Sequence, residues 1–165
     1  MGTNHMGRQS IRFPQPPVVR GFASVAGKKE REGPLGDQFT ATVQDTTFGE
    51  KSWERAERRM QQMTLELALE KAGLTDADLD AAFAGDLLNQ CIGSSFSLRN
   101  RGVPTLGLYG ACSTMAESLL LAAMSVSGGF ARTALAMTSS HFASSERQYR
   151  FPCLLYTSDA ADGLT

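Results

Sequence analysis

One cysteine, Cys112, lies between two apolar segments in the sequence LYGACSTMAESLLLAAM. The residues before it predict a strand, and the residues after it predict a helix that begins directly after a tight turn. The first N–H groups of a helix have no intrahelical partner, and the helix dipole is positive there. Such a position favours a thiolate, an oxyanion or a carboxylate. We therefore predict that Cys112, Ser113 and Thr114 bind an anionic ligand, with Cys112 as the nucleophile if the protein is an enzyme.

A histidine, His141, follows another predicted strand in the sequence TALAMTSSH. Ligands often bind at the carboxyl ends of the strands in α/β sheets, so His141 is a further candidate ligand-binding residue. A structural role is the alternative for both side chains. Free cysteines usually pack as small apolar residues, and single histidines commonly make structural hydrogen bonds.

The remaining side chains argue against a metal centre. The chain has two histidines, too few for a typical multi-histidine site, and three widely spaced cysteines without a CxxC pattern. Neither a GxGxxG nor a Walker A sequence is present. We predict no metal and no cofactor, apart from a coenzyme A thioester if Cys112 is catalytically active.

Strands and helices alternate along the predicted elements that would position these residues. Apolar runs predict strands at 18–25, 81–88, 105–109 and 133–140, and helices are predicted at 52–72, 94–102 and 114–127. Ser52 is a predicted N-cap, and Gly73 a predicted C-terminal cap, of the longest helix. This order predicts an α/β fold with a mostly parallel sheet flanked by helices.

The two long helices differ in pattern. The helix at 52–72 has one apolar face, made of Trp53, Ala56, Met60, Met63 and Leu67. The helix at 114–127 is apolar all round, with Glu117 as its one charged residue. It is shorter than the roughly 20 residues of a membrane span, so we predict a buried central helix covered on both sides. The chain offers little material for that cover, which indicates a missing second half or a partner.

Composition places the chain among ordinary globular proteins, with 42% hydrophobic and 20% charged residues. A net charge of -1 and the absence of a compact basic block argue against nucleic-acid binding. The N-terminal residues lack the apolar core of a signal peptide, and no segment predicts a membrane span. We therefore expect a reducing interior compartment.

Three regions follow from these patterns. Residues 1–8 are predicted to be a disordered leader, and residues 9–152 a globular unit. Residues 153–165, which begin at Cys153, show no clear periodicity and resemble the translation of a sequencing adapter. We predict that this tail is not native.

Five segments together resemble the stage V sporulation protein AD family of spore-forming bacteria: GPLGDQF, FGEKSWERAE, FAGDLLNQ, LYGACSTMAESL and TSSHFASSERQYRFP. They agree with the family in order, over residues 9–152. The family belongs to the thiolase-like superfamily, whose fold has two similar halves packed around buried central helices. The resemblance implies that this chain is the N-terminal half and that Cys112 lies where thiolases keep their acylated cysteine.

The resemblance also implies a role in spores. It implies binding of dipicolinic acid, or its calcium chelate, with uptake into the developing spore and release at germination. The implied partners are membrane-embedded subunits of the same transport complex, and the implied location is the cytoplasm or forespore, peripheral to the spore inner membrane. A homodimer is expected by analogy alone.

A site for a planar aromatic dianion needs N–H donors, cations and flat walls. The candidate cations are Arg99, Arg101, Arg147 and Arg150, and the candidate walls are Tyr109, Phe142 and Tyr149. For each arginine, a solvated surface charge is the alternative.

Two other functions remain open. The first is an acyltransferase or condensing enzyme in which Cys112 forms a thioester, although the family is regarded as lacking proven condensing activity. In thiolase-like enzymes the activating histidines come from the second half, which leaves His141 as the local candidate. The second is an interaction subunit that docks on membrane partners without a ligand of its own.

Overall fold

The computed structural model describes residues 4–156, with side chains described for residues 4–149. Its elements, in chain order, are β1 (His5–Met6), β2 (Ser10–Ile11), β3 (Val25–Ala26), α1 (Lys28–Arg31), β4 (Ala41–Thr42), α2 (Trp53–Ala72), β5 (Ala81–Gly85), α3 (Ile92–Leu98), β6 (Thr105–Gly107), α4 (Thr114–Ser127), β7 (Ala134–Thr138) and α5 (Phe142–Tyr156). Short 3₁₀ turns cover Gly36–Gln38, Asp76–Asp78, Asn89–Cys91 and Ala111–Ser113.

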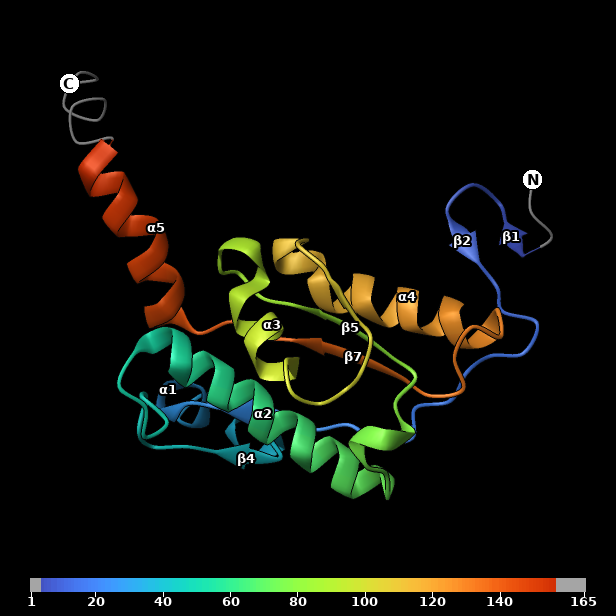
Figure 1. Cartoon of the computed structure of the whole chain (residues 1–165), viewed down its shortest axis with the longest axis horizontal. Helices are drawn as coiled ribbons and strands as arrows, with labels where there is room; N and C mark the ends of the chain where they lie inside the picture. Colours follow the sequence, from blue (N-terminus) through green and yellow to red (C-terminus); the bar gives the residue numbers. More distant parts are fainter. Residues whose placement is uncertain (1–3, 157–165) are drawn as a thin grey trace.

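The main sheet has three parallel strands in the order β6-β5-β7. Figure 1 shows β5 beside β7. Phe83 in the central strand lies opposite Leu106 on one side and Ala136 on the other. The connection from β5 to β6 through α3 runs in the opposite direction across the sheet from the connection from β6 to β7 through α4. Because such crossovers are right-handed, the two helices must lie on opposite faces.

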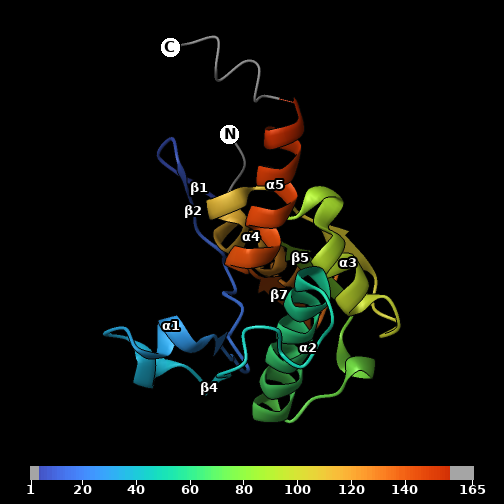
Figure 2. The same ribbon diagram turned by 90° about the vertical axis from the view of Figure 1, so that its left-hand side faces the viewer.

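Successive side chains of each strand point to opposite faces of the sheet. Ala82, Ala84 and Met137 pack with Leu65 of α2 and Leu98 of α3. On the other face, Phe83 and Leu108 pack with Ala122 of α4. Figures 1 and 2 show α4 on one side of β5 and β7, with α2 and α3 on the other. The predicted α/β fold with a parallel sheet flanked by helices is confirmed.

The ends of α2 are where the sequence predicts them. The Ser52 side chain accepts a hydrogen bond from the N–H of Arg55 at 3.3 Å. Gly73 ends the helix in the left-handed conformation, at φ 66°. The predicted apolar face is correct at Ala56, but the buried line of α2 continues through Glu57, Gln61 and Leu65 instead of the other predicted residues. Two polar residues of that line are tolerated because they are hydrogen-bonded.

Several predicted strands are shorter than expected, and one is largely absent. Only Val25 of the predicted strand 18–25 pairs, in the two-residue strand β3 beside β4. Val18, Val19 and Phe22 are 73–78% exposed, so the prediction that they are buried is wrong for this chain. The apolar run has no neighbouring strand among the described residues to cover it. Residues 5–6 of the predicted leader form β1, which pairs antiparallel with β2 at residues 10–11.

Helix α4 occupies the predicted residues, but it is covered on one side only. Thr114, Ser118 and Ala122 are buried against the sheet. The opposite side leaves four large apolar side chains 40–46% exposed: Met115, Leu119, Leu120 and Met124. The predicted enclosure on both sides is therefore not formed by residues 4–149. Within the described part of the chain, no helix combines the length and hydropathy needed to cross a membrane.

The exposed side of α4 gives a first prediction. Replacing Leu119 and Leu120 by lysine should raise the soluble, monomeric fraction of the 165-residue chain and lower its binding of a hydrophobic dye, because a contiguous apolar surface promotes association. Size-exclusion chromatography and dye fluorescence measure both effects.

The matched control is Ala122→Lys, on the same helix. Ala122 is 8% exposed and packs on Phe83, so this variant should lose its cooperative unfolding transition. If the double lysine variant also lost its cooperative transition, the prediction would be contradicted, because the outer face of α4 would then be covered in solution.

Candidate functional site

Three loops meet at the carboxyl edge of the sheet, because the carboxyl ends of parallel strands point the same way. Asp86 follows β5, the turn that contains Cys112 follows β6, and Ser139 follows β7. Helices α4 and α5 both begin at this edge, which Figure 1 shows beside α3. The carboxyl edge is where α/β proteins generally bind ligands.

The Cys112 turn is a 3₁₀ turn that leads directly into α4. The N–H of Ser113 donates to the carbonyl of Gly110 at 3.0 Å, and the N–H of Thr114 donates to the carbonyl of Ala111. The hydroxyl of Ser113 also donates to Gly110, at 2.7 Å. The hydroxyl of Thr114 accepts from the N–H of Gly110, at 3.1 Å. The turn therefore consumes most of its own polar groups.

Two donors remain available at this turn. No described residue accepts a hydrogen bond from the N–H of Ala111 or of Cys112. Both residues are exposed, and the Cys112 thiol is free. Thr114 is 1% exposed, so its side chain holds the turn and cannot reach a ligand in solvent. Of the predicted trio, Cys112 and Ser113 face solvent, and Ala111 supplies the second free donor.

The turn packs closely on β5. A Cβ at Gly85 would lie 2.1 Å from the Leu108 carbonyl oxygen and 2.6 Å from Cγ2 of Thr114, so only glycine fits. The buried thiol of Cys91 donates to the same carbonyl, at 3.1 Å. Burial raises the pKa of the Cys91 thiol, which fits a structural role. Ala111 has φ 48°, an unusual conformation that this packing maintains.

His141 lies at the same edge, but its contacts are with the loop before α2. Its Nε2 donates to the carbonyl of Thr46 at 2.8 Å, because a carbonyl can only accept. Its ring lies 6.3 Å from the Phe48 ring and 5.7 Å from the Trp53 ring. Nδ1 is buried without a described partner. No contact of the described residues joins His141 to Cys112.

A buried hydrogen-bond network, which sequence reasoning missed, connects the loops at this edge. Gln61 lies at its centre, with Nε2 donating to Ser139 Oγ at 2.7 Å and to Ser94 Oγ at 3.1 Å. Gln61 Oε1 accepts from Ser97 at 2.6 Å. Ser139 then donates to Glu57 Oε1 at 2.6 Å. The network joins α2, α3 and the end of β7.

Asp86 is the second buried carboxylate of this network. One oxygen accepts from the N–H of Leu88 at 2.9 Å, and the other accepts from the N–H and the hydroxyl of Ser94, each at 2.7 Å. These bonds hold the loop after β5, in which Gln90 and Cys91 both have positive φ, 58° and 50°. Such backbone persists only where surrounding contacts determine it.

A signal for the network exists in the sequence. Glu57, Gln61 and Leu65 are spaced by four, so they share one helix face, and Leu65 alone marks that face as buried. Asp86 and Ser139 each follow directly after an apolar strand. Polar residues at both kinds of position indicate an edge network, but their pairing cannot be read from spacing alone.

The predicted aromatic walls are partly brought together. The hydroxyls of Tyr109 and Tyr149 contact each other and the carbonyl of Leu87. The hydrogen bond with Tyr109 raises the pKa of Tyr149 to about 12, so Tyr149 is neutral at ordinary pH. Phe142 is 80% exposed and takes no part in this contact.

Most of the predicted cations already have partners. Arg101 bonds Asp76 at 3.0 Å and Glu66 at 3.1 Å. Arg147 pairs with Glu54 at 2.9 Å. Arg99 lies over the ring of Phe96, 5.8 Å from its centroid. The side chains of Arg150 and Cys153 lie outside the described ones.

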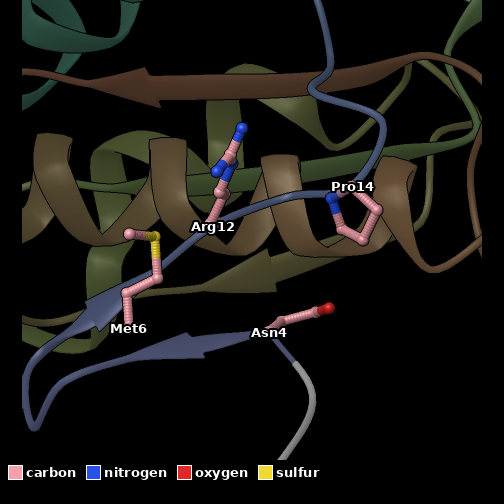
Figure 3. Close-up of a pocket in the computed structure, with 4 residues that line it drawn as sticks. All are labelled: Asn4, Met6, Arg12 and Pro14. Atoms are coloured by element: carbon pink, nitrogen blue, oxygen red, sulfur yellow. The ribbon is translucent and has the colours of Figure 1, made fainter.

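A pocket elsewhere on the surface does not coincide with this edge. Asn4, Met6, Arg12 and Pro14 line a space of about 230 Å³ beside the N-terminal hairpin (Figure 3). Met6 lies in β1, Asn4 lies directly before it, and Arg12 and Pro14 follow β2; none was predicted as a site residue. We assign no function to this pocket.

The fold and the edge define a class of protein before any comparison. It is a layered α/β protein with a cysteine turn that opens a helix at the carboxyl edge of a parallel sheet, an arrangement consistent with a thiolase-like fold. The sequence model of the stage V sporulation protein AD family matches residues 7–160. Stage V sporulation protein AD of Bacillus subtilis (strain 168) is 44% identical over 146 residues, which cover 88% of this chain.

The chain therefore belongs to the stage V sporulation protein AD family, and the resemblance noted in the sequence is confirmed. It spans 43% of the length of the Bacillus subtilis relative. The family match includes residues 153–160, which belong to the predicted non-native tail. Residues 157–165 of that tail lie outside the described part of the chain. The nature of that tail stays a prediction.

The role of Asp86 can be tested by truncation. Asp86→Ala should lower the free energy of unfolding by about 2–5 kcal/mol, because two buried N–H groups and a hydroxyl lose their acceptor. Urea unfolding followed by circular dichroism measures the change. The control is Asp37→Ala at an exposed position, which should leave the free energy of unfolding unchanged. If Asp86→Ala also left it unchanged, the network would be contradicted.

Glu57 gives a prediction on pH. Burial is the main cause that raises its pKa above the ordinary 4.5. An acid that binds its proton more tightly in the folded state contributes stability below about pH 4.5, and this is lost as the pH rises toward the folded pKa. Glu57→Gln should remove that decline in urea unfolding series from about pH 4 to about pH 8. Parallel pH profiles of the two proteins would exclude it.

Proposed function

We propose that this chain forms part of a sporulation protein that binds dipicolinic acid at the Cys112 turn and supports its uptake into the developing spore and its release at germination. The observation that carries this proposal is that two exposed residues, Ala111 and Cys112, have backbone N–H groups without a described acceptor. Free backbone donors at the start of a helix suit a carboxylate. Membership of the family supports the sporulation role.

The surroundings of the turn supply further elements of such a site. Tyr109, three residues before Cys112, is 60% exposed and is held by its bond to Tyr149. Tyrosine offers a flat wall for an aromatic ligand. Arg147 pairs with Glu54 of α2 at 2.9 Å, and its place two residues before Tyr149 puts it on another face of α5.

The wider role is proposed from the family resemblance alone. We propose that the ligand is taken as the free acid or as its calcium chelate. We propose membrane-embedded subunits of the same transport complex as partners, and a location in the cytoplasm or forespore, peripheral to the spore inner membrane. A homodimer is a further proposal of the same kind.

Charge at position 112 tests the ligand site directly. In the full-length protein, Cys112→Asn should keep saturable dipicolinate binding, whereas the nearly isosteric Cys112→Asp should weaken it at least tenfold. A unit charge 4 Å away is worth about 1–4 kcal/mol between water and a protein surface, and tenfold corresponds to about 1.4 kcal/mol. Isothermal titration calorimetry measures both affinities. Equal affinities would place the ligand elsewhere, and no saturable binding to the unmodified protein would refute the proposed ligand.

An acyltransferase is the second candidate, favoured by the exposed thiol beside the same two donors. The thiolate would attack the carbonyl of an acyl-coenzyme A, and coenzyme A would leave as the free thiol. Intact-mass spectrometry after incubation with acyl-coenzyme A decides this, with Cys112→Asn as the control. An acyl adduct that is lost in the variant would establish the enzyme.

A further inference from the structure

Glu117, the one charged residue of α4, turns back toward the turn that carries Cys112. A Cβ built on Gly110 would lie 2.6 Å from Glu117 Oε2 and 2.7 Å from Ser113 Oγ. Since a bond from Cα to Cβ is about 1.5 Å long, Glu117 Oε2 lies within about 4 Å of the Gly110 Cα. The carboxylate therefore lies against the residue at which the turn begins.

The two free donors of the proposed ligand site belong to the same turn. The backbone nitrogen of Ala111 is about 2.4 Å from the Gly110 Cα, because one carbonyl carbon separates the two atoms. Glu117 Oε2 therefore lies within about 6.5 Å of this donor. The side-chain hydrogen bonds of the turn are made by Ser113 and Thr114. Among the described residues, the carboxylate and the donors thus remain available to one ligand.

Glu117 is half-buried and has no ion-pair partner among the described residues. The ion pairs of residues 4–149 are made by other acids: Glu50, Glu54, Glu66 and Asp76. A second carboxylate, Asp86, follows β5 at the same edge and accepts three hydrogen bonds, none of them from a charged group. The edge therefore combines free N–H donors with a carboxylate whose charge is not compensated.

A free dicarboxylate anion is poorly matched to this combination. Its oxygens can accept from the N–H groups, but a negative charge at the Ala111 donor would lie about 6 Å from the charge of Glu117. Repulsion between two unit charges at about this distance lowers an affinity by roughly threefold to hundredfold, depending on the effective dielectric constant. A dicarboxylate that carries a divalent cation avoids this repulsion, because its net charge is zero and its cation attracts Glu117.

We propose that Glu117 makes this site selective for the chelate of a dicarboxylate with a divalent cation over the free dicarboxylate anion, an inference that rests on the proposed function. A ligand oxygen accepts from the free N–H groups, and Glu117 binds the cation. Calcium takes about six to eight oxygen ligands, so a chelating dicarboxylate leaves positions for a protein carboxylate. The described residues contain no cluster of three or more metal-ligating side chains, and the proposal requires none, because the ligand itself holds the cation.

A structural role for Glu117 is the alternative that a test must separate. Glu117 lies in the first turn of α4, where an acidic side chain interacts favourably with the helix dipole. Loss of such a role would lower stability and would affect the binding of both ligand forms alike. The ratio of the affinity for the chelate to the affinity for the free dicarboxylate is therefore the quantity to measure.

Calorimetric titration of the full-length protein with calcium-free dipicolinate, and with its calcium chelate, gives this ratio. A titration with calcium chloride alone corrects for cations that bind elsewhere. The wild type should bind the chelate about tenfold more tightly. Glu117→Gln should bind the free form more tightly and the chelate less tightly than the wild type, so that the ratio falls toward one. Glu66→Gln is the matched control and should keep the wild-type ratio, because Glu66 is exposed and pairs with Arg101, which precedes β6 at the opposite edge of the sheet.

The outcomes separate the selectivity from the ligand site itself. Equal binding of the two forms by the wild type, or a preference that Glu117→Gln retains, overturns the role of Glu117 but leaves the ligand site standing. No binding of either form by the wild type overturns both proposals. If Glu117→Gln does not fold, the wild-type ratio decides: tighter binding of the chelate supports the selectivity, and equal or tighter binding of the calcium-free form refutes it.

Discussion

The loops after β5 and β7 depend on a buried amide, Gln61, that holds two carboxylate-centred clusters together. One cluster fixes the turn after β7 through Glu57 and Ser139, and the other fixes the loop after β5 through Ser94 and Asp86. Buried polar groups without partners are costly, so each member makes the others necessary. The positions of the loops are thus set by hydrogen bonds of fixed direction and not only by apolar packing, which lacks direction.

Two apolar surfaces of the chain, unlike the polar carboxyl edge, lack contacts that cover them. Helix α4 buries one side against Phe83 and Leu108 and leaves its other side open to solvent, and the segment with Val18 and Val19 is open as well. A helix that is apolar all round can bury all of its side chains only when it lies between two layers. Residues 4–149 supply one of these layers, in a chain that spans 43% of the length of its Bacillus subtilis relative. The uncovered faces are therefore properties of this chain, and their composition suits a covering layer.

Periodicity predicted the elements of this fold well where local rules decide. Ser52 and Gly73 mark the ends of α2, and Gly128 and Gly129 follow the end of α4, because capping depends on neighbouring residues alone. Which residues are buried was harder to predict, because burial depends on the elements that pack against a helix or strand from elsewhere in the chain. Glu57 and Gln61 are polar and yet fully buried, because serines from α3, β7 and α5 reach them from far along the chain.

The same distinction between local and distant contacts applies to the predicted ligand site at Cys112. The position of Cys112 before a helix is a local property, and the structure has it there. Which N–H groups remain free is decided by the internal bonds of the turn. Thr114 bonds Gly110 and faces inward, so the free donors belong to Ala111 and Cys112. No spacing rule distinguishes these outcomes.

The arrangement around Cys112 favours holding an anion over forming a thioester. A nucleophilic cysteine is activated by an adjacent base or by a lowered thiol pKa, and thiolases use histidines for this purpose. Among the described side chains, the local candidate, His141, is occupied by Thr46 and packed against Phe48 and Trp53. Two backbone donors need no such partner, because an N–H group binds a carboxylate without proton transfer. The turn can therefore bind an anion with the residues it has, whereas no described side chain is hydrogen-bonded to the Cys112 thiol as a base.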